Sequence, residues 1–224
     1  MAGEYTLYGS RNSGSAAVEA ALEIARAPYR IVSAASWDKT SARAELKRVN
    51  PLMQIPTLVT PDGTVLTESA ACLIHLALVH PRSGLLPREA AQRAQALRAL
   101  VFIAANCYAA IGIIDYPARW HGKGDDAADE RLRKGTRKRL YKLWELFADT
   151  FAGTAHEPGF LFGAARPGAA DLLAAVVSRW SGARKHLARR RPAFHALLER
   201  VEAHPSVAAV FERHWGAGPV VVAP

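Results

Sequence analysis

The chain has 224 residues, of which 50% are hydrophobic and 22% are charged, a globular composition that suits one large domain or two small ones. We see no secretory signal, no apolar run near the ~18–20 residues that span a bilayer, and no disulfide pattern at Cys72 and Cys107. The net charge is +9, but its basic clusters lack a recognition motif, so we interpret them as solvated helix faces and expect no nucleic-acid or membrane partner.

The N-terminal segments predict a strand, a helix and a second strand. Residues 5–9 read as a short buried strand, and 11–15 form a polar turn. Helical periodicity follows over 16–25, and Pro28 opens a second strand over 29–32. This order within about thirty residues is typical of a βαβ unit with parallel strands.

The next segments predict a helix, a hairpin and another helix. Residues 41–49 form a polar-faced helix or turn, and 57–59 and 65–67 read as strands around the turn Pro61-Asp62-Gly63. A helix over 70–78 follows, with Ser69 as its N-cap. The whole order is that of a thioredoxin-like domain.

Residues 81–88 have the composition of a linker, and everything after them predicts helices. Asp171 falls at the third position of one of these helices, where its carboxylate would accept from the Gly168 N–H. The predicted helices cover 89–110, 126–151, 169–180, 193–203 and 206–215.

The stretch from Asn50 to Ser69 carries the candidate ligand chemistry. Pro56 stands where an edge strand would begin, and a cis Ile55–Pro56 bond would leave the backbone of Ile55 free for another extended peptide. Ser69 at a helix start favours an anion, and Glu68 offers a carboxylate to an ammonium. These features describe a small extended peptide with an amino-acid-like end.

The residues Gln54-Ile55-Pro56-Thr57-Leu58, followed by Glu68-Ser69, resemble the glutathione-binding half of the cytosolic glutathione S-transferases. The resemblance implies a thioredoxin-like α/β domain over 1–80, a linker over 81–88 and an all-helical domain over 89–224. It further implies a cytoplasmic homodimer that transfers the thiolate of glutathione, its co-substrate, to a small electrophile. The scattered histidines give no support for a metal.

The same resemblance assigns the glutathione contacts. Ile55 would pair its backbone with the cysteinyl unit, Pro56 would hold that geometry, and Gln54 would lie at the glycyl side. Glu68 and Ser69 would bind the γ-glutamyl ammonium and carboxylate. Either Lys39 or Arg11 would neutralise a carboxylate, and the sequence does not choose between them.

The thiol donor should lie in the polar turn that holds Ser10, Asn12, Ser13 and Ser15. Registering the helix on the serine-type classes puts Asn12 at their catalytic position, with Ser13 next. We favour Ser13 slightly over Asn12 because a hydroxyl is the more usual donor, followed by Ser10 and Ser15. The alternative is that these residues only cap the helix. The turn has no cysteine, which disfavours disulfide chemistry there.

The second substrate would lie between the domains. Asn106, Tyr108, Tyr116 and Trp120 are candidates for an apolar pocket, although residues at such spacing are more often simple core. Two other functions stay open. One is a glutathione-dependent reductase or peroxidase, and the other is a non-catalytic glutathione-binding or partner-docking module.

Overall fold

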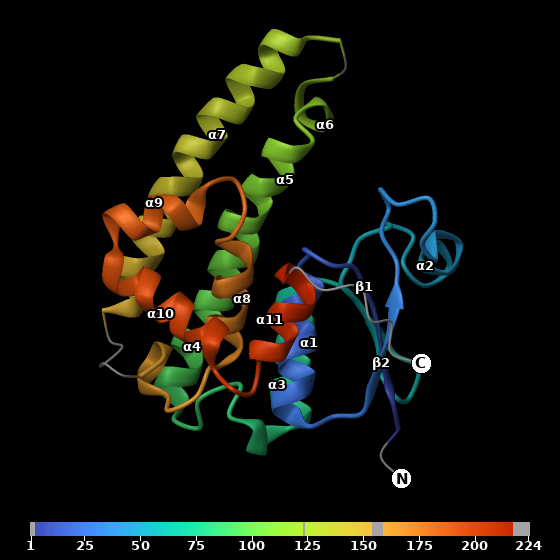
Figure 1. Ribbon diagram of the computed structural model, residues 1–224, viewed down its shortest axis with the longest axis vertical. Helices are drawn as coiled ribbons and strands as arrows, with labels where there is room; N and C mark the ends of the chain where they lie inside the picture. The colour runs from blue at the N-terminus through green and yellow to red at the C-terminus, as the bar shows by residue number, and fades with distance from the viewer. Residues whose placement is uncertain (1–2, 123, 154–158, 217–224) are drawn as a thin grey trace.

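A computed structural model describes residues 3–122, 124–153 and 159–216. The first part of the chain forms a four-stranded sheet with helices against it, and the rest is helical (Figure 1). The elements of the first part are β1 (Tyr5–Gly9), α1 (Ser15–Ala25), β2 (Tyr29–Ser33), α2 (Arg43–Val49), β3 (Thr57–Val59), β4 (Val65–Leu66) and α3 (Ser69–Val79).

The sheet has the strand order β2-β1-β3-β4. β1 pairs parallel with β2 and antiparallel with β3, and β3 pairs antiparallel with β4. The predicted βαβ unit and hairpin are therefore confirmed. The prediction that Pro56 opens an edge strand is wrong, because β3 lies between β1 and β4. Pro56 precedes the strand, so its missing N–H removes no ladder hydrogen bond.

The apolar faces of α1 and α3 pack together and cover one side of the sheet. Leu7 of β1 and Leu22 of α1 are fully buried in this core, with Leu73 of α3. α1 also contacts two helices of the helical part, α8 (Ala169–Val177) and α11 (Ala208–Trp215), so it is buried on nearly all sides. A smaller cluster around Tyr8 and Leu46 lies apart from that core, under α2.

A 3-10 turn at Pro81–Ser83 leads into the helical part. Its elements are α4 (Ala90–Phe102), a π-helical stretch (Ile103–Tyr108), α5 (Ala109–Asp115), α6 (Ala118–His121), α7 (Asp126–Phe147), a second π-helical stretch (Ala148–Ala152), a 3-10 turn (Leu161–Gly163), α8 (Ala169–Val177), α9 (Ala183–Arg190), α10 (Pro192–Ala203) and α11 (Ala208–Trp215).

α4, the first π-helical stretch and α5 form one continuous helix over Ala90–Asp115. By length and composition this helix could cross a membrane, contrary to our sequence prediction, but a core helix of a globular protein meets the same criterion. Its buried residues, among them Leu100, Ile103 and Ile111, belong to the main core. The helix packs against α7 and α8.

Helix ends account for most other differences from the sequence predictions. Asp171 accepts from the backbone N–H of Gly168 at 2.9 Å and of Leu161 at 3.0 Å, which confirms its capping role. Sequence reasoning missed α9, because only Ala183 and Leu187 of its eight residues are buried. It also missed the single turn of α6.

Candidate functional site

The turn between β1 and α1 is held together by its own serines. The Ser13 hydroxyl donates to the Ser10 carbonyl at 2.7 Å and lies 2.8 Å from the Ser15 hydroxyl. The Ser15 hydroxyl in turn accepts from the Ser10 N–H at 3.3 Å. Both hydroxyls are buried. Ser13 and Ser15 therefore close the turn onto the first residues of α1.

Asn12 lies on the outside of the same turn. Its φ of 56° is in the left-handed region, which asparagine adopts more readily than most residues. The side chain is exposed. The amide therefore faces solvent at the start of α1, where backbone N–H groups favour a negative charge.

Tyr108 brings the helical part to this turn. A Cβ added at Gly14 would lie 2.2 Å from the Tyr108 hydroxyl oxygen, so the phenol reaches the first turn of α1. The Tyr108 ring also packs against the Trp180 ring in a tilted arrangement, with ring centroids 5.6 Å apart. Burial, together with the negative charges of Glu68 and Asp115, raises the pKa of Tyr108 to about 12. Tyr108 is therefore a neutral hydrogen-bonding group.

Glu68 and Ser69 lie at the start of α3. The prediction that Ser69 caps this helix is wrong, because the capping position is Glu68 and Ser69 is the first helical residue. Glu68 has a φ of 63°, an uncommon conformation for this residue, and its side chain is exposed. This backbone turn points a carboxylate outward next to the buried Ser69 at a helix N-terminus.

The loop before β3 presents Ile55 outside the sheet. The Ile55–Pro56 peptide bond is cis, and the β3 ladder begins only at Thr57. Asn50 fixes the loop, because its buried side-chain amide donates to the Gln54 carbonyl and to the Thr57 hydroxyl, both at 2.9 Å. Sequence reasoning gave Asn50 no role. An asparagine at the end of a predicted helix is the only signal it offered.

The end of α11 reaches the same turn. The Arg11 guanidinium donates to the Gly216 carbonyl at 2.7 Å, so Arg11 is engaged within the protein. Further along α1, the buried Glu19 bonds Arg213 at 2.6 Å and His214 at 2.8 Å. α11 thus contacts both the turn and the helix that follows it.

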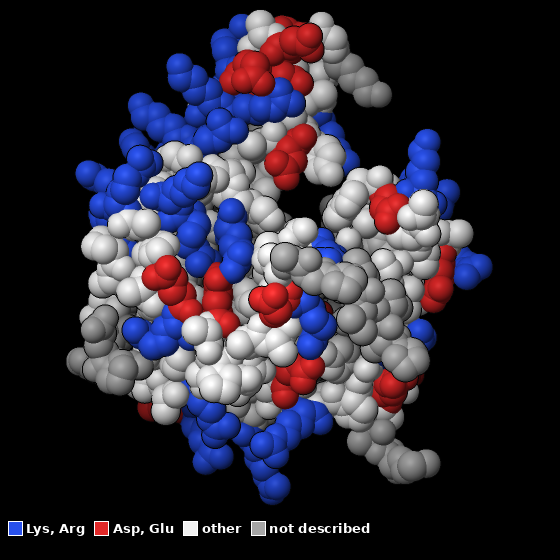
Figure 2. Space-filling model, in the orientation of Figure 1, with Lys and Arg blue, Asp and Glu red and all other residues white. Residues whose placement is uncertain are grey.

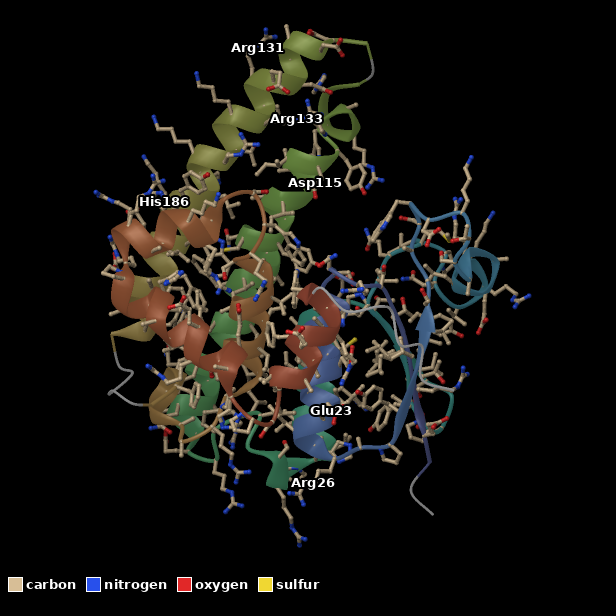
Figure 3. All side chains as sticks on the ribbon, in the orientation of Figure 1. Glu23, Arg26, Asp115, Arg131, Arg133 and His186 are labelled. Atoms are coloured by element: carbon tan, nitrogen blue, oxygen red, sulfur yellow. The ribbon has the colours of Figure 1, made fainter. Side chains whose placement is uncertain are left out.

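The four candidates for the electrophile pocket lie in different surroundings. Tyr108 lies at the turn, but the Asn106 side chain donates back to the Phe102 carbonyl at 3.2 Å. Tyr116 and Trp120 are exposed, and the Arg119 guanidinium lies over the Tyr116 ring. Asp115, at the end of α5, is labelled in Figure 3, and burial raises the pKa of its carboxyl. Sequence reasoning did not single out Asp115.

Other chemistry finds little support in the described part of the chain. There, no group of three or more His, Cys, Asp or Glu side chains is placed to hold a metal ion. Cys72 and Cys107 are buried, free thiols, and burial raises the pKa of both, that of Cys72 to about 12. Neither is a reactive nucleophile.

Comparisons with known proteins agree on one family. Residues 15–78 match the model of the glutathione S-transferase N-terminal domain. The uncharacterised GST-like protein YncG of Escherichia coli K12 is 36% identical over 154 residues, 65% of this chain and 72% of that protein. A probable maleylacetoacetate isomerase of Caenorhabditis elegans is 34% identical over 102 residues, 46% of this chain and 45% of that protein, so the chain matches less than half of its length.

A solved structure extends the likeness to nearly the whole chain. The glutathione transferase homologue from Sulfitobacter, crystallised with bound glutathione, superposes with a TM-score of 0.79 at 24% identity and covers 94% of this chain and 98% of its own. That likeness, together with the sheet and the helical part described above, establishes the predicted fold class.

Proposed function

Because this chain belongs to the glutathione S-transferase family, we propose that it binds glutathione beside the turn before α1 and transfers the thiolate to an electrophile. One observation carries the proposal. The Tyr108 phenol of the helical part reaches Gly14 at the start of α1, and the carboxylate of Glu68, from the first part, is near enough to raise the pKa of that phenol. A carboxylate, a phenol and a helix N-terminus thus share one site.

The peptide would lie along the loop before β3. Ile55 stands outside the β3 ladder, so its backbone N–H and C=O pair with the cysteinyl unit in the manner of an added strand. Gln54 lies next to it on the glycyl side, and Pro56 holds the backbone. Glu68 binds the γ-glutamyl ammonium, and the start of α3 at Ser69 binds its carboxylate.

We assign the thiol contact to Asn12 in preference to Ser13, which reverses the preference of the sequence analysis. The Ser13 hydroxyl has one proton, and it already donates to the Ser10 carbonyl. The Asn12 amide is exposed at the start of α1 and has two donors. Lowering the thiol pKa by ~2 units takes about 2.7 kcal/mol, which one hydrogen bond to the thiolate and the helix N-terminus together supply.

The electrophile would enter from the helical side, next to Tyr108. The sulfur forms the new bond to its carbon, and the displaced electron pair leaves with the leaving group or takes up a proton. Tyr108 is protonated at neutral pH because its pKa is raised, so it donates a hydrogen bond to an oxygen of that substrate. Tyr116 and Trp120, both exposed, form the outer wall in this proposal.

We also propose that the protein is a cytoplasmic homodimer. Leu78 and Val79 of α3 are exposed, as is Val101 of α4, and α3 and α4 contact each other. Exposed apolar side chains on neighbouring helices are typical of a subunit interface. Size-exclusion chromatography with light scattering measures the mass, and a monomer at micromolar concentration contradicts this part of the proposal.

Calorimetry with Glu68→Ala tests the glutathione site. We expect the variant to lose about 2 kcal/mol or more of binding free energy, the cost of removing a charged hydrogen bond. Glu4→Ala is the matched control, because Glu4 is an exposed carboxylate of the same part, paired only at 3.8 Å with Arg30. Equal affinities for all three proteins would remove Glu68 from the site.

Turnover of model substrates distinguishes the three candidate functions. The wild-type protein is assayed with glutathione and an aryl halide, a peroxide or a small disulfide. Conjugation of the aryl halide supports the proposed transferase. Reduction of the peroxide or disulfide without conjugation favours the reductase, and binding of glutathione without turnover of any substrate favours the non-catalytic module.

A further inference from the structure

The middle of α7 exposes only basic side chains. Between residues 131 and 142, every exposed residue is lysine or arginine except Gly135. We call this set the cationic face: Arg131, Lys134, Arg137, Lys138, Arg139 and Lys142. In Figure 2 the basic side chains gather on the side of the molecule where α7 and α9 run.

Most of the cationic face has no acidic partner. Within the described ranges, no carboxylate lies within 4.0 Å of its members, apart from Asp125 at 4.0 Å from Arg131. The acidic residues of this region occupy the two ends. Glu130 pairs with Arg133, and Glu145 pairs with His186 of α9. The charge of the middle is therefore uncompensated and available to an anionic partner.

The geometry of α7 spreads this charge over a projecting half-cylinder. At 3.6 residues per turn and 1.5 Å per residue, the six side chains point over an arc of about 200° and span about 16 Å. The opposite side, with Thr136 and Leu140, is buried, and α5 packs against α7. α9 packs against the later part of α7, where His186 stacks on Tyr141, so the arc projects over residues 131–139. Figure 1 shows the first half of α7 extending beyond α9, and Figure 3 labels Arg131 near its tip.

Gly135 adds a second feature to the same face. A Cβ placed there would meet nothing within 4 Å, so packing does not require the glycine, although glycine inside a helix costs about 0.5–1 kcal/mol. Viewed along the axis of α7, Gly135 lies between Arg131 and Arg139. Because it has no side chain, the surface of a large partner can approach the helix backbone there.

From the sequence we expect no nucleic-acid partner, but the unpaired charge of this face favours one. We propose that the cationic face of α7 binds the phosphate backbone of double-stranded DNA, without sequence preference. The major groove of B-DNA, about 12 Å wide, admits a helix between two rims of phosphates, and an arc of about 200° presents cations to both rims. The exposed residues between 131 and 142 include no aromatic side chain to stack on single-stranded bases. They also include no apolar side chain to enter a membrane.

Fluorescence anisotropy with a labelled DNA duplex about two helical turns long tests the proposal. With five or six phosphate contacts, the logarithm of the association constant should fall against that of the salt concentration with a slope of about −5. The triple variant Lys134→Gln, Lys138→Gln, Lys142→Gln should reduce the magnitude of that slope by about 2.7, since each lost contact removes about 0.9. Glutamine is nearly as good a helix former as lysine.

The control is Lys47→Gln, Arg48→Gln, Arg82→Gln, which removes the same charge from exposed positions away from α7. It should keep the wild-type slope. The proposal is overturned by any of three results: the α7 variant binds like wild type, the control loses as much as the α7 variant, or the protein binds phosphatidylcholine–phosphatidylserine vesicles and not the duplex.

Discussion

Replacing the buried Glu19 by glutamine should destabilise the protein by about 3 kcal/mol. Its side chain, only 2% exposed, bonds the Arg213 guanidinium at 2.6 Å and the His214 ring at 2.8 Å. Removing one partner of a buried charge pair typically costs 3–5 kcal/mol, because the other charge stays buried. We take the lower figure because Arg213 is 40% exposed, so its guanidinium regains water.

Glu23→Gln is the matched control on the same helix. Glu23 pairs with the same Arg213 at 3.2 Å, but its side chain is 41% exposed, so we expect a loss below about 1 kcal/mol. Urea unfolding followed by tryptophan fluorescence measures both variants. In a thermal scan, Glu19→Gln should lower Tm by about 6–12 °C, at about 2–4 °C per kcal/mol for a chain of this size.

The pH dependence of the stability difference between the wild-type protein and Glu19→Gln gives a second test. Burial opposes ionisation of Glu19, but the hydrogen bonds from His214 and Arg213 outweigh it and lower its pKa. A carboxylate with a lowered folded pKa stabilises the protein above its unfolded pKa, about 4.3, and loses that contribution as the pH falls through the folded value. The free energies of unfolding of the wild-type protein and Glu19→Gln should therefore differ by the full amount at pH 6 to 7, and by less below about pH 4. A difference under 1 kcal/mol at neutral pH, or one equal to that of Glu23→Gln, would refute the reasoning.

Three further predictions concern single residues. Asn12→Ala should raise the pKa of bound glutathione thiol, read from thiolate absorbance, by about 1 unit or more, whereas Ser13→Ala should leave it nearly unchanged; the reverse order identifies Ser13 as the donor. Gly14→Ala places a Cβ 2.2 Å from the Tyr108 hydroxyl and should cost about 1–3 kcal/mol in urea unfolding, less in a Tyr108→Phe background. Gly135→Ala should stabilise the protein by about 0.5–1 kcal/mol, and a loss of stability there would show that the helix needs the glycine.

Local patterns predict the sheet well. The run Tyr5 to Gly9 becomes β1 with its expected bounds, and the Pro61-Asp62-Gly63 turn joins β3 to β4. Alternation, turn residues and proline act within a few positions, so the sequence shows them directly. The capping position of α3 is a narrower case. Serine is the better cap by propensity, yet Glu68 takes the position with a left-handed backbone, which propensity does not predict.

Contacts between distant segments account for the rest of the candidate site. That Tyr108 lies over Gly14, or that Arg213 pairs with Glu19 at a separation of 194 residues, depends on how the helical part packs against α1. Periodicity predicts that Tyr108 lies on a helix, but it does not predict which neighbour its hydroxyl meets. The sequence favours Ser13 as the thiol donor, but it does not show that the Ser13 hydroxyl already donates inside the turn.

The bond from Arg11 to the Gly216 carbonyl has a consequence for how the protein is made. Arg11, in the turn before α1, can make this bond only after the ribosome has added more than two hundred further residues. A nascent chain released or stalled before α11 would lack the residues that bond Arg11 and Glu19. Glutathione captured by such truncated chains should therefore be weaker than by the full-length protein, and equal capture would show that α11 leaves the turn unaffected.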